Sequence, residues 1–441
     1  MSIFSVKGGT RLKGVYRVSG AKNAAPKLLL ASLLTKERCV FENIPNFSDT
    51  QQMVTALQHV GVRMRSLTPH TIEAQGETIV RTRIPAAAAR ARQSVLFIGT
   101  MLARAGRVTL SLPRGDAIGR RPLNRHFEGI KALGGTLRHT GRTLALTLPA
   151  RPRAMRYRFE KNTHTGTENL ILASVFNEGT VILQNAAQEP EVDNLIETLN
   201  RMGARIRRTA PRTIAIAGVP PLLNGARASA IPDRLEAATA ITASILTGGG
   251  ITVARAPRRL LVPFARFCTR IGVRLRWKGD TVAVSPFRLP LKPARLSTGP
   301  HPGFMTDWQP LATLIVATLA RGKSTIHERV FETRWRYLQE LHNMGVRSDT
   351  FQPKGWTPKD YNFNDEDYSA REPHAAAVWG PTRLTATELH SHDVRAGMDM
   401  LLAALSAKGT SVIRDPHGHI ERGYEDIVGK LKRLGADITR H

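Results

Sequence analysis

The stretch at residues 55–66, TALQHVGVRMRS, joins a helix-like run of apolar residues to a strand-like run through one glycine, Gly61. Apolar residues three and four positions apart favour a helix, and alternation after the glycine favours a strand. Glycine is typical at this point because it has no Cβ to oppose the left-handed backbone that ends a helix. The further copies of this pattern are EGIKALGGTLRH (128–139), ETLNRMGARIRR (197–208), RFCTRIGVRLRW (266–277), QELHNMGVRSDT (339–350) and GKLKRLGADITR (429–440).

A second pattern alternates with the first: a helix-like run ends at a polar or glycine turn, and a β-branched strand follows. Shorter alternating runs, TLALTL (143–148) and TIAIA (213–217), add strands. Six units of about seventy residues result, and they divide as three plus three. The copies are ASLLTKERCVFENI (31–44), GTMLARAGRVTLSL (99–112), LASVFNEGTVILQN (172–185), TASILTGGGITVAR (242–255), VATLARGKSTIHER (316–329) and LAALSAKGTSVIRD (402–415).

One interval between the repeated glycines is longer than the others. The glycines Gly61, Gly134, Gly203, Gly272, Gly345 and Gly435 are 73, 69, 69, 73 and 90 residues apart. The surplus of about twenty residues falls at 351–377, where proline, glycine, asparagine and acidic residues are frequent. This composition predicts an inserted surface loop.

Composition restricts the class of protein. The chain has 441 residues, 41% hydrophobic and 22% charged, which is typical of a globular protein with two or three domains. Its two cysteines, Cys39 and Cys268, exclude a disulfide framework and fit a reducing compartment; both lie in apolar segments and are expected to be buried. We find no signal-peptide pattern, and the longest apolar runs stop at about ten residues, whereas a membrane helix needs about twenty. We therefore expect a soluble, cytoplasmic protein.

The net charge of +29, from 64 Lys and Arg against 35 Asp and Glu, raises the question of a nucleic-acid partner. Of the basic residues, 49 are Arg and 15 are Lys, and they are scattered through every segment instead of forming one stripe. A genome-wide preference for arginine gives the same distribution. Charge alone specifies a partner weakly, so we expect no nucleic-acid partner.

Two segments in the first third of the chain carry residues suited to binding anions. SGAKNAA (19–25) is a small-residue turn before an apolar helix, and a helix N-terminus beside Lys22 suits an anion, although a simple helix start explains it equally. LPRGDAIGRRP (112–122) is rich in glycine and arginine and holds one carboxylate, Asp116. Such a loop suits phosphates, and the structural alternative is a solvated surface loop.

Two further candidates lie in the last third. HPGFMTDWQ (301–309) places Asp307 before an apolar helix, where it belongs either to a site or only to the helix cap. Arg334, Arg395 and Arg422 form a loose set that composition alone explains as ordinary arginines of an arginine-rich chain. His417 and His419 have HxH spacing without a further ligand pattern, so we expect no metal and no cofactor.

Taken together and in order, these segments resemble the UDP-N-acetylglucosamine 1-carboxyvinyltransferases, the enolpyruvyl transferases that catalyse the first committed step of peptidoglycan synthesis. The resemblance covers nearly the whole chain except 351–377. No single motif is specific, but the ordered set is. The motifs are SGAKNAA (19–25), SLPRGDAIGRRP (111–122), QEPEVDNL (188–195), IPDRLEAAT (231–239), HPGFMTDWQ (301–309), VFETR (330–334), HDVRAG (392–397) and ERGYE (421–425).

The resemblance implies an α/β fold: a two-domain inside-out α/β barrel of six βαβαββ units, three per domain around buried helices, with substrates in the cleft between domains. The first three-repeat domain would span 21–230. The second would combine 1–20 with 231–441 and contain the inserted loop near 351–377. The chain would cross between the domains near Gly20 and Ile231.

It also implies an activity. The family transfers the enolpyruvyl group of phosphoenolpyruvate to the 3-hydroxyl of UDP-N-acetylglucosamine and releases phosphate, which serves cell-wall synthesis and hence cell shape and division. The two substrates are the expected partners, without a membrane. Phosphoenolpyruvate carries a phosphate and a carboxylate, so several Lys and Arg must meet it. Attack at C2 with protonation of C3 requires a general acid, and a carboxylate must lie near the attacking hydroxyl.

The implied catalytic residues are Asp116, Lys22, Asp307, Arg395 and Arg422, with Asp116 as the acid and Asp307 beside the sugar hydroxyl. Lys22 and Asn23 match residues that meet phosphoenolpyruvate and the sugar, and Val330 matches a sugar contact. Arg92, Arg121, Arg395 and Arg422 match active-site arginines. The implied nucleotide-binding stretches are Arg121, Pro122, Leu123, Asn124 and Arg125, and Lys161, Asn162, Thr163 and His164.

Two departures from the family pattern matter. Most members have Cys where this chain has Asp116, and an Asp can donate a proton if its surroundings raise its pKa. It cannot form the thioether that fosfomycin forms with Cys, so we expect an enzyme insensitive to that drug. The run at 162–165 replaces a usual Ser-Val-Gly run, and Asn124 replaces a usual Asp, which leaves the exact UDP-sugar open.

Two other functions compete. The enolpyruvyl transferase of the shikimate pathway is the nearest enzyme, and the KNA and RRP segments argue against it. The second alternative is a catalytically silent paralogue that binds nucleotides or RNA through its charge. Lys22, Asp307, Arg395 and Arg422 argue against silence, whereas the fold does not, because a fold does not fix a function.

Overall fold

The structure is a computed structural model that describes residues 2–113, 118–148 and 151–441, without the side chain of Arg90. The chain divides into two compact units. Unit 1 consists of Met1–Ser19, Asp116–Arg121 and Pro232–His441, and unit 2 consists of Gly20–Gly115 and Pro122–Ile231.

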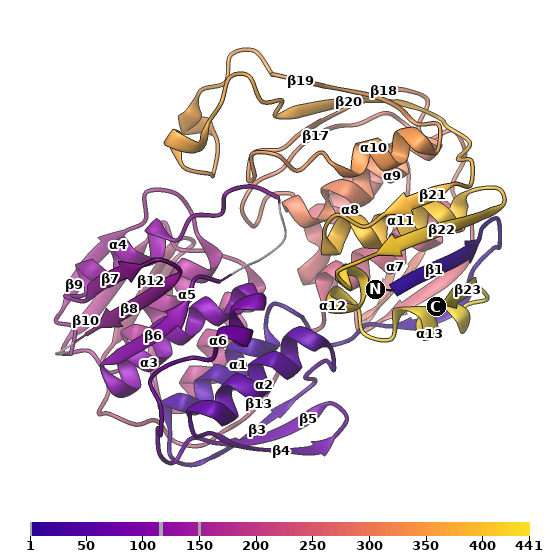
Figure 1. Cartoon of the computed structure of the whole chain (residues 1–441). Helices are drawn as coiled ribbons and strands as arrows, with labels where there is room; N and C mark the ends of the chain where they lie inside the picture. Colours follow the sequence, from indigo (N-terminus) through magenta and orange to yellow (C-terminus); the bar gives the residue numbers. More distant parts are fainter. Residues whose placement is uncertain (1, 114–117, 149–150) are drawn as a thin grey trace. The chain divides into compact units, whose positions relative to one another are not determined.

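Three open sheets form the strand layers of unit 2 (Figure 1). Their strand orders are β13-β3-β5-β4, β6-β8-β7 and β11-β12-β10-β9. The pairs β13–β3 and β9–β10 are parallel, and the other pairs are antiparallel. The strands are β3 Arg38–Glu42, β4 Arg63–Thr68, β5 Thr71–Gln75, β6 Arg107–Ser111, β7 Thr136–Thr140, β8 Thr143–Thr147, β9 Met155–Arg158, β10 Thr180–Gln184, β11 Arg205–Ala210, β12 Thr213–Ala217 and β13 Arg227–Ser229.

The helices of unit 2 supply its core. Every residue of α1 is buried, α5 is buried from Gly166 onward, and α3 packs against both. Most of the residues buried in α1 and α3 are apolar, as burial on all sides requires, and the charged Lys27 of α1 and Glu168 of α5 form an ion pair. The helices are α1 Ala25–Ala31, α2 Ser48–Val60, α3 Phe97–Ala105, α4 Asn124–Ala132, α5 His164–Ala173 and α6 Pro190–Arg201.

Unit 1 also contains three open sheets, ordered β15-β16-β14-β2, β17-β18-β20-β19 and β21-β22-β1-β23. The last of these pairs the first strand of the chain with the final one, so both chain ends are held in one sheet (Figure 1). The strands are β1 Ser2–Lys7, β2 Lys13–Arg17, β14 Gly250–Ala254, β15 Leu275–Lys278, β16 Thr281–Val284, β17 Arg295–Ser297, β18 Gly322–His327, β19 Arg347–Phe351, β20 Ala375–Gly380, β21 Glu388–His390, β22 Thr410–Asp415 and β23 Asp437–Arg440.

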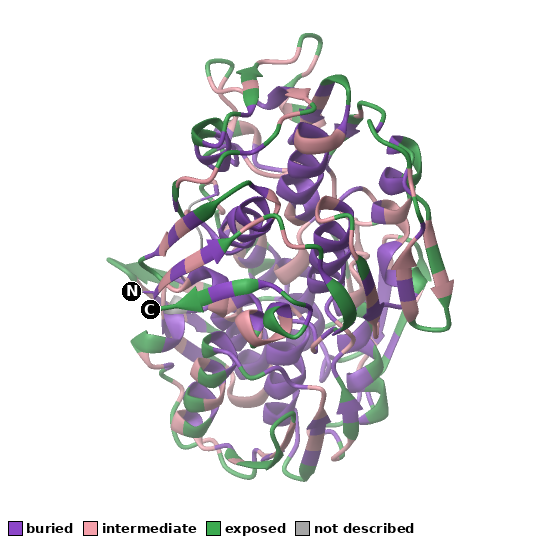
Figure 2. Cartoon of the chain, turned by 90° about the vertical axis from the view of Figure 1, so that its right-hand side faces the viewer, coloured by how far each residue is buried: buried purple, intermediate pink, exposed green. Residues whose placement is uncertain are grey.

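Helices α7, α9 and α11 pack on one another and form the centre of unit 1. Their residues are buried almost throughout, and exposed residues (green in Figure 2) gather on strands and connections. Because their N-terminal ends are equally buried, polar side chains placed there are shielded from water. The helices are α7 Arg234–Leu246, α8 Arg258–Ile271, α9 Gln309–Leu319, α10 Tyr337–Asn343, α11 Val394–Ser406, α12 His419–Gly423 and α13 Ile427–Lys432.

The predicted order of helices and strands is confirmed. Each of the twelve quoted runs contains a helix followed by a strand, with a 3₁₀ helix, η1 (Ser32–Leu34), in the run at 31–44. The six repeated glycines all have positive φ, between 89° and 113°, as a left-handed helix stop requires. Both cysteines are buried. No described sheet closes into a barrel, so the architecture is a mixed α/β fold of open sheets and helices.

The expectation of a simple surface loop at 351–377 needs correction. Strand β19 ends at Phe351 and β20 begins at Ala375, so the predicted loop includes the start of a strand. The connection, residues 352–374, also has a small core of its own, because Tyr361, Phe363 and His374 are at most 4% exposed. Among the described residues, no helix is long and apolar enough to cross a membrane.

Candidate active site

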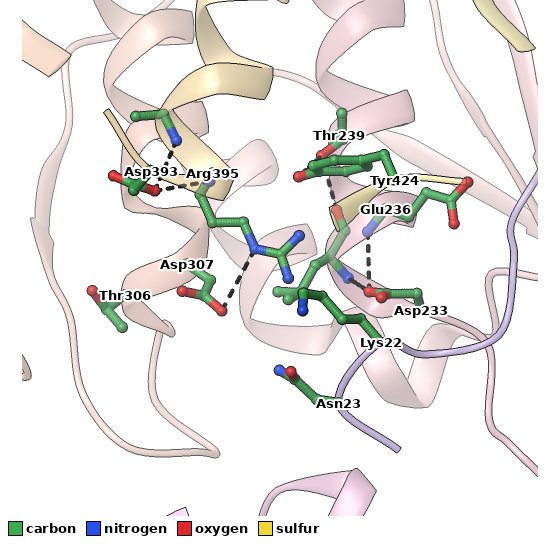
Figure 3. A network of polar contacts seen from close by, with 12 residues as sticks. Lys22, Asn23, Asp233, Glu236, Thr239, Thr306, Asp307, Asp393, Arg395 and Tyr424 are labelled. Carbon is green, nitrogen blue, oxygen red and sulfur yellow. Dashed lines mark hydrogen bonds and ion pairs between the residues drawn. The ribbon is translucent and has the colours of Figure 1, made fainter. Parts of the chain in front are cut away.

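Asp307 lies in a 3₁₀ turn, η4 (Thr306–Trp308), directly before α9. It does not cap that helix, whose start has no side-chain cap. Its Oδ1 instead accepts a hydrogen bond from Nη1 of Arg334 at 2.8 Å. Its Oδ2 lies 3.8 Å from Nε of Arg395 (Figure 3). Burial opposes ionisation of Asp307, but the guanidinium groups outweigh it and lower its pKa. A charged carboxylate at neutral pH results.

The start of α11 positions Arg395. Asp393 caps this helix by accepting hydrogen bonds from the backbone N–H groups of Arg395 and Ala396, at 2.8 and 3.1 Å (Figure 3). The guanidinium group lies 5.3 Å from the ring centre of Tyr424. Its side chain is only 6% exposed, and Nη1 is buried without a hydrogen-bond partner among the described residues. A buried donor of this kind is costly unless an anion binds it.

Arg334 connects the two acids of this cluster. Its Nη1 donates to Thr306 Oγ1 at 2.9 Å as well as to Asp307, and its Nη2 lies 3.7 Å from Asp393 Oδ1. The side chain is 2% exposed. Sequence reasoning noticed Arg334 but assigned it no role in the site. The VFETR motif was the signal that could have found it.

The segment before Arg334 is fixed by a buried acid. Both Thr298 and Thr306 donate to the Glu328 carboxylate, at 3.0 and 2.9 Å. Its Oε1 also accepts from the backbone N–H groups of Val330 and Phe331 at 2.8 and 3.1 Å. Glu328 thereby joins the backbone at Val330, the predicted sugar contact, to the η4 turn that contains Asp307. Nothing in the sequence pattern singled out Glu328.

Arg121 and Arg422 also belong to unit 1. Arg121 lies 5.7 Å from the ring centre of Phe331 and contributes to the lowered pKa of Asp307. Arg422 lies in α12, two residues before Tyr424, whose ring contacts Arg395. Unit 1 thus places Arg334, Arg395 and Arg121 near the carboxylate of Asp307. Asp116, the predicted acid, lies outside the described residues.

The other predicted residues lie in unit 2. Lys22, in the turn before α1, forms an ion pair with Asp49 of α2 and lies 5.5 Å from the ring centre of Phe47. Its side chain is 8% exposed and that of Asp49 is 2% exposed. Neighbouring Asn23 accepts a hydrogen bond from Gln93 at 3.2 Å. Asp49 and Gln93 were not predicted, and no pattern marked them.

Arg92 and Arg125 converge on His126. Both cations add to the effect of burial, which comes first, and the pKa of His126 falls to about 3. The neutral ring is held by Asn169 at 2.7 Å and by Thr165 at 3.2 Å. His126 occupies the first turn of α4, just after Pro122, Leu123 and Asn124 of the predicted nucleotide stretch.

The second predicted nucleotide stretch is joined to the first. Arg125 donates to the backbone carbonyl of Asn162 at 3.0 Å, and Thr163 caps α5. His164 Nε2 lies 2.9 Å from Lys27 Nζ and 3.2 Å from the Glu168 carboxylate. Burial and Lys27 lower the pKa of His164, but Glu168 outweighs them and raises it. Lys161 lies immediately before these residues, and the hydrogen bond from Arg125 joins this stretch to the part of the first that lies in unit 2.

Comparisons with known proteins agree with this chemistry. The family model EPSP synthase (3-phosphoshikimate 1-carboxyvinyltransferase) matches residues 6–431. UDP-N-acetylglucosamine 1-carboxyvinyltransferase 1 of Symbiobacterium thermophilum is 36% identical over 99% of this chain and 95% of its own. The Koribacter versatilis UDP-N-acetylglucosamine 1-carboxyvinyltransferase is 36% identical over 100% of this chain and 96% of its own.

Two solved structures have a similar fold. The enolpyruvyl transferase NikO from Streptomyces tendae superimposes with a TM-score of 0.86 at 25% identity, covering 100% of this chain and 98% of that one. EPSP synthase from Acinetobacter baumannii has a TM-score of 0.69 at 16% identity, with complete coverage of both chains. With its arginine-flanked carboxylate and these full-length matches, the chain belongs to the EPSP synthase family and is an enolpyruvyl (1-carboxyvinyl) transferase.

Proposed function

We propose that the enzyme transfers the enolpyruvyl group of phosphoenolpyruvate to the 3-hydroxyl of UDP-N-acetylglucosamine and releases phosphate. The relatives that are 36% identical over nearly the full chain carry this name, which supports the choice of acceptor. The reaction would supply a peptidoglycan precursor, and the cytoplasmic location expected from the sequence is part of the proposal. So are the two three-repeat domains, 21–230 and 1–20 with 231–441, and their inside-out barrel architecture.

One observation carries the proposal: a charged carboxylate, Asp307, is held between the buried guanidinium groups of Arg334 and Arg395. Arg395 keeps a buried donor, Nη1, that suits the phosphate or carboxylate of phosphoenolpyruvate. When such an anion binds Arg395, less of its positive charge acts on Asp307, and the pKa of the carboxylate rises towards that of a useful base. Asp307 would then accept the proton of the attacking sugar hydroxyl.

The other residues take roles that the family resemblance implies. Asp116 would protonate C3 of the alkene, and Arg422 would stabilise negative charge with Arg395. Lys22, Asn23 and Arg92 would bind phosphoenolpyruvate and the sugar, and Val330 the sugar. The two nucleotide stretches, Arg121–Arg125 and Lys161–His164, would bind the UDP group. Loss of phosphate from C2 of the tetrahedral adduct, together with loss of a proton from C3, then leaves the enol ether.

A phosphate-release assay tests the acceptor. With phosphoenolpyruvate present, UDP-N-acetylglucosamine is expected to support release and shikimate 3-phosphate is not. Asp116→Asn keeps the shape of the side chain but removes the proton donor, so a loss of about 10²- to 10⁴-fold in kcat is expected with the fold intact. Release with shikimate 3-phosphate alone would replace the proposed acceptor.

Fosfomycin gives a second test of the residue at 116. A carboxylate does not form the thioether that a cysteine forms with the drug, so the wild-type enzyme is expected to keep its activity. Asp116→Cys should restore labelling by one equivalent of fosfomycin, measured by intact mass. Stoichiometric labelling of the wild-type protein would contradict this role of Asp116.

The silent nucleotide- or RNA-binding paralogue remains the second candidate because of the net charge of +29. It predicts RNA affinity that falls steeply with salt and no phosphate release with any acceptor. The same preparation can be used for both measurements. Turnover without such affinity would leave the transferase as the function.

A further inference from the structure

The connection between β19 and β20, residues 352–374, has no role in the reaction as proposed above. It is nevertheless firmly attached to the segment that carries Val330 and Arg334. Arg329 donates through Nε and Nη2 to the backbone carbonyl of Asp360 at 3.1 and 2.6 Å, and its guanidinium group lies 4.8 Å from the ring centre of Trp356. The backbone N–H of Asn362 donates to the carbonyl of Arg329 at 2.7 Å.

A cluster of aromatic and histidine rings packs within this connection. Tyr361 lies at its centre, with ring-centre distances of 5.0 Å to Phe363, 5.5 Å to Tyr368 and 4.8 Å to His374. The Tyr361 hydroxyl also lies 3.1 Å from Nε2 of His327, at the end of β18. Ring pairs at these separations contribute beyond the area they bury, so they stabilise the fold of this connection.

Asp367 links the connection 352–374 to the loop around Arg120. Arg120 Nη1 donates to Asp367 Oδ1 at 3.0 Å. The Asp367 side chain is 6% exposed, whereas that of Arg120 is 72% exposed. The second carboxylate oxygen, Oδ2, is buried and has no hydrogen-bond partner among the described residues. A buried carboxylate needs a countercharge, and Arg120 supplies it.

Glu332 holds the same loop from a second side. Burial raises the pKa of its carboxyl group, the backbone N–H of Arg120 acts in the opposite direction, and the residue is 3% exposed. It packs so closely on Gly119 that a Cβ built there would lie 1.9 Å from Glu332 Oε2. Gly119 also has a φ of +148°, a backbone conformation that other residues rarely adopt. Two consecutive residues of the loop, Gly119 and Arg120, therefore lie against Glu332.

We propose that Asp367 is a positioning residue for transfer, which holds the 118–121 loop through Arg120 and thereby positions Arg121. The inference rests on the proposed function for its kinetic consequence. Arg121, the next residue after Arg120, acts on the Asp307 carboxylate. A small displacement of a catalytic group reduces rate strongly, so the ion pair affects turnover without touching substrate.

The test compares Asp367→Asn with Glu366→Gln in the full-length enzyme. Glu366 is exposed, lies in the same 3₁₀ turn, η6 (Asp365–Asp367), and controls for the loss of one negative charge. Asp367→Asn is expected to lower kcat about fivefold with KM for UDP-N-acetylglucosamine within twofold, since a half-exposed ion pair contributes at most about 1 kcal/mol. Glu366→Gln should match the wild type, and Asp367→Glu should recover part of the rate.

Arg120→Gln completes a double-mutant cycle. If Arg120 acts through Asp367, the double variant is no slower than either single variant, whereas independent roles give multiplied losses. A kcat of Asp367→Asn equal to that of the wild type, or multiplied losses in the double variant, would overturn the proposal.

Limited trypsin digestion tests how firmly the 118–121 loop is held, and this measurement does not depend on catalysis. Cleavage between Arg120 and Arg121, mapped by mass spectrometry, is expected to be several-fold faster in Asp367→Asn than in Glu366→Gln. Equal cleavage rates would overturn the positioning role. If the wild type transfers to no acceptor at all, the proposed function fails, and the cleavage rates still decide whether Asp367 holds the loop.

Discussion

Two clusters in this chain place a pair of guanidinium groups beside one titratable side chain. In unit 1, Arg334 and Arg395 flank Asp307, whose pKa is lowered although its burial acts in the opposite direction. In unit 2, burial, Arg92 and Arg125 all lower the pKa of His126, to about 3. Both side chains therefore lack a proton at neutral pH, but one carries a negative charge and the other carries none.

The two clusters differ in the charge of the side chain once it has lost its proton. A positive field favours the deprotonated form of any neighbour. In unit 1 the result is a carboxylate that can serve as a base, within an ion-pair network that includes Asp393. In unit 2 the result is a neutral ring held by the uncharged side chains of Asn169 and Thr165. The first cluster is suited to proton transfer and the second to the binding of phosphate groups.

Asp307→Asn removes the titratable carboxylate of the unit 1 cluster. The amide keeps the shape and can still contact Arg334, but it cannot accept a proton, so kcat for phosphate release should fall by about 10²- to 10⁴-fold. Asp349→Asn on exposed β19 is the matched control and should be unaffected. Thermal unfolding would verify that both variants fold. A kcat for Asp307→Asn within twofold of the wild type would remove Asp307 as the base.

Arg395→Lys keeps the positive charge of this cluster but removes the planar guanidinium group. The buried Nη1 donor would be lost, and an ammonium group cannot bind a phosphate or carboxylate through two parallel hydrogen bonds. A lost hydrogen bond to a charged group corresponds to about 10- to 100-fold, expected here as a higher KM for phosphoenolpyruvate. Arg321→Lys, at an exposed position, controls for the exchange. An unchanged KM would exclude Arg395 as a ligand of that substrate.

The sequence predicted the local structure well because local signals encode it. Gly61 and its counterparts end helices wherever they occur, and the alternation after them becomes strands. Asp307 illustrates the limit: its position before α9 suggested a cap as readily as a site. Its actual partners are Arg334, 27 residues away, and Arg395, and only tertiary packing brings them together.

The connection 352–374 shows a different limit. Its prolines, glycine and acids suggested a solvated loop, and the spacing of its aromatic residues matches neither a helix nor a strand. Tyr361 and Phe363 nevertheless form a core with His374, which is the last residue before β20 and lies 13 and 11 positions further along the chain. Likewise, nothing in the local pattern indicated that His126 is neutral, since its pKa depends on burial and on Arg92.

The pH dependence of stability tests the unit 2 side of the comparison. A histidine with a pKa of about 3 in the folded state and about 6.5 unfolded binds its proton only on unfolding at intermediate pH. Its contribution to stability is therefore complete above pH 6.5 and is lost as the pH falls from there towards 3. Between pH 7 and 5.5 the loss should be about 1 kcal/mol. Asp307 does not titrate in this window, because its lowered pKa lies below it.

His126→Gln isolates this contribution, since glutamine can keep hydrogen bonds to Asn169 and Thr165 without a titratable ring. His327, whose pKa is lowered to about 4, first by burial, acts in the same direction and remains in both proteins. Urea unfolding of the wild type and the variant at pH 7 and 5.5 would therefore show a difference that shrinks, or reverses, by about 1 kcal/mol at the lower pH. A difference independent of pH would mean that His126 binds its proton equally in the folded and the unfolded enzyme. The two arginine pairs would then not act in the same way on their neighbours.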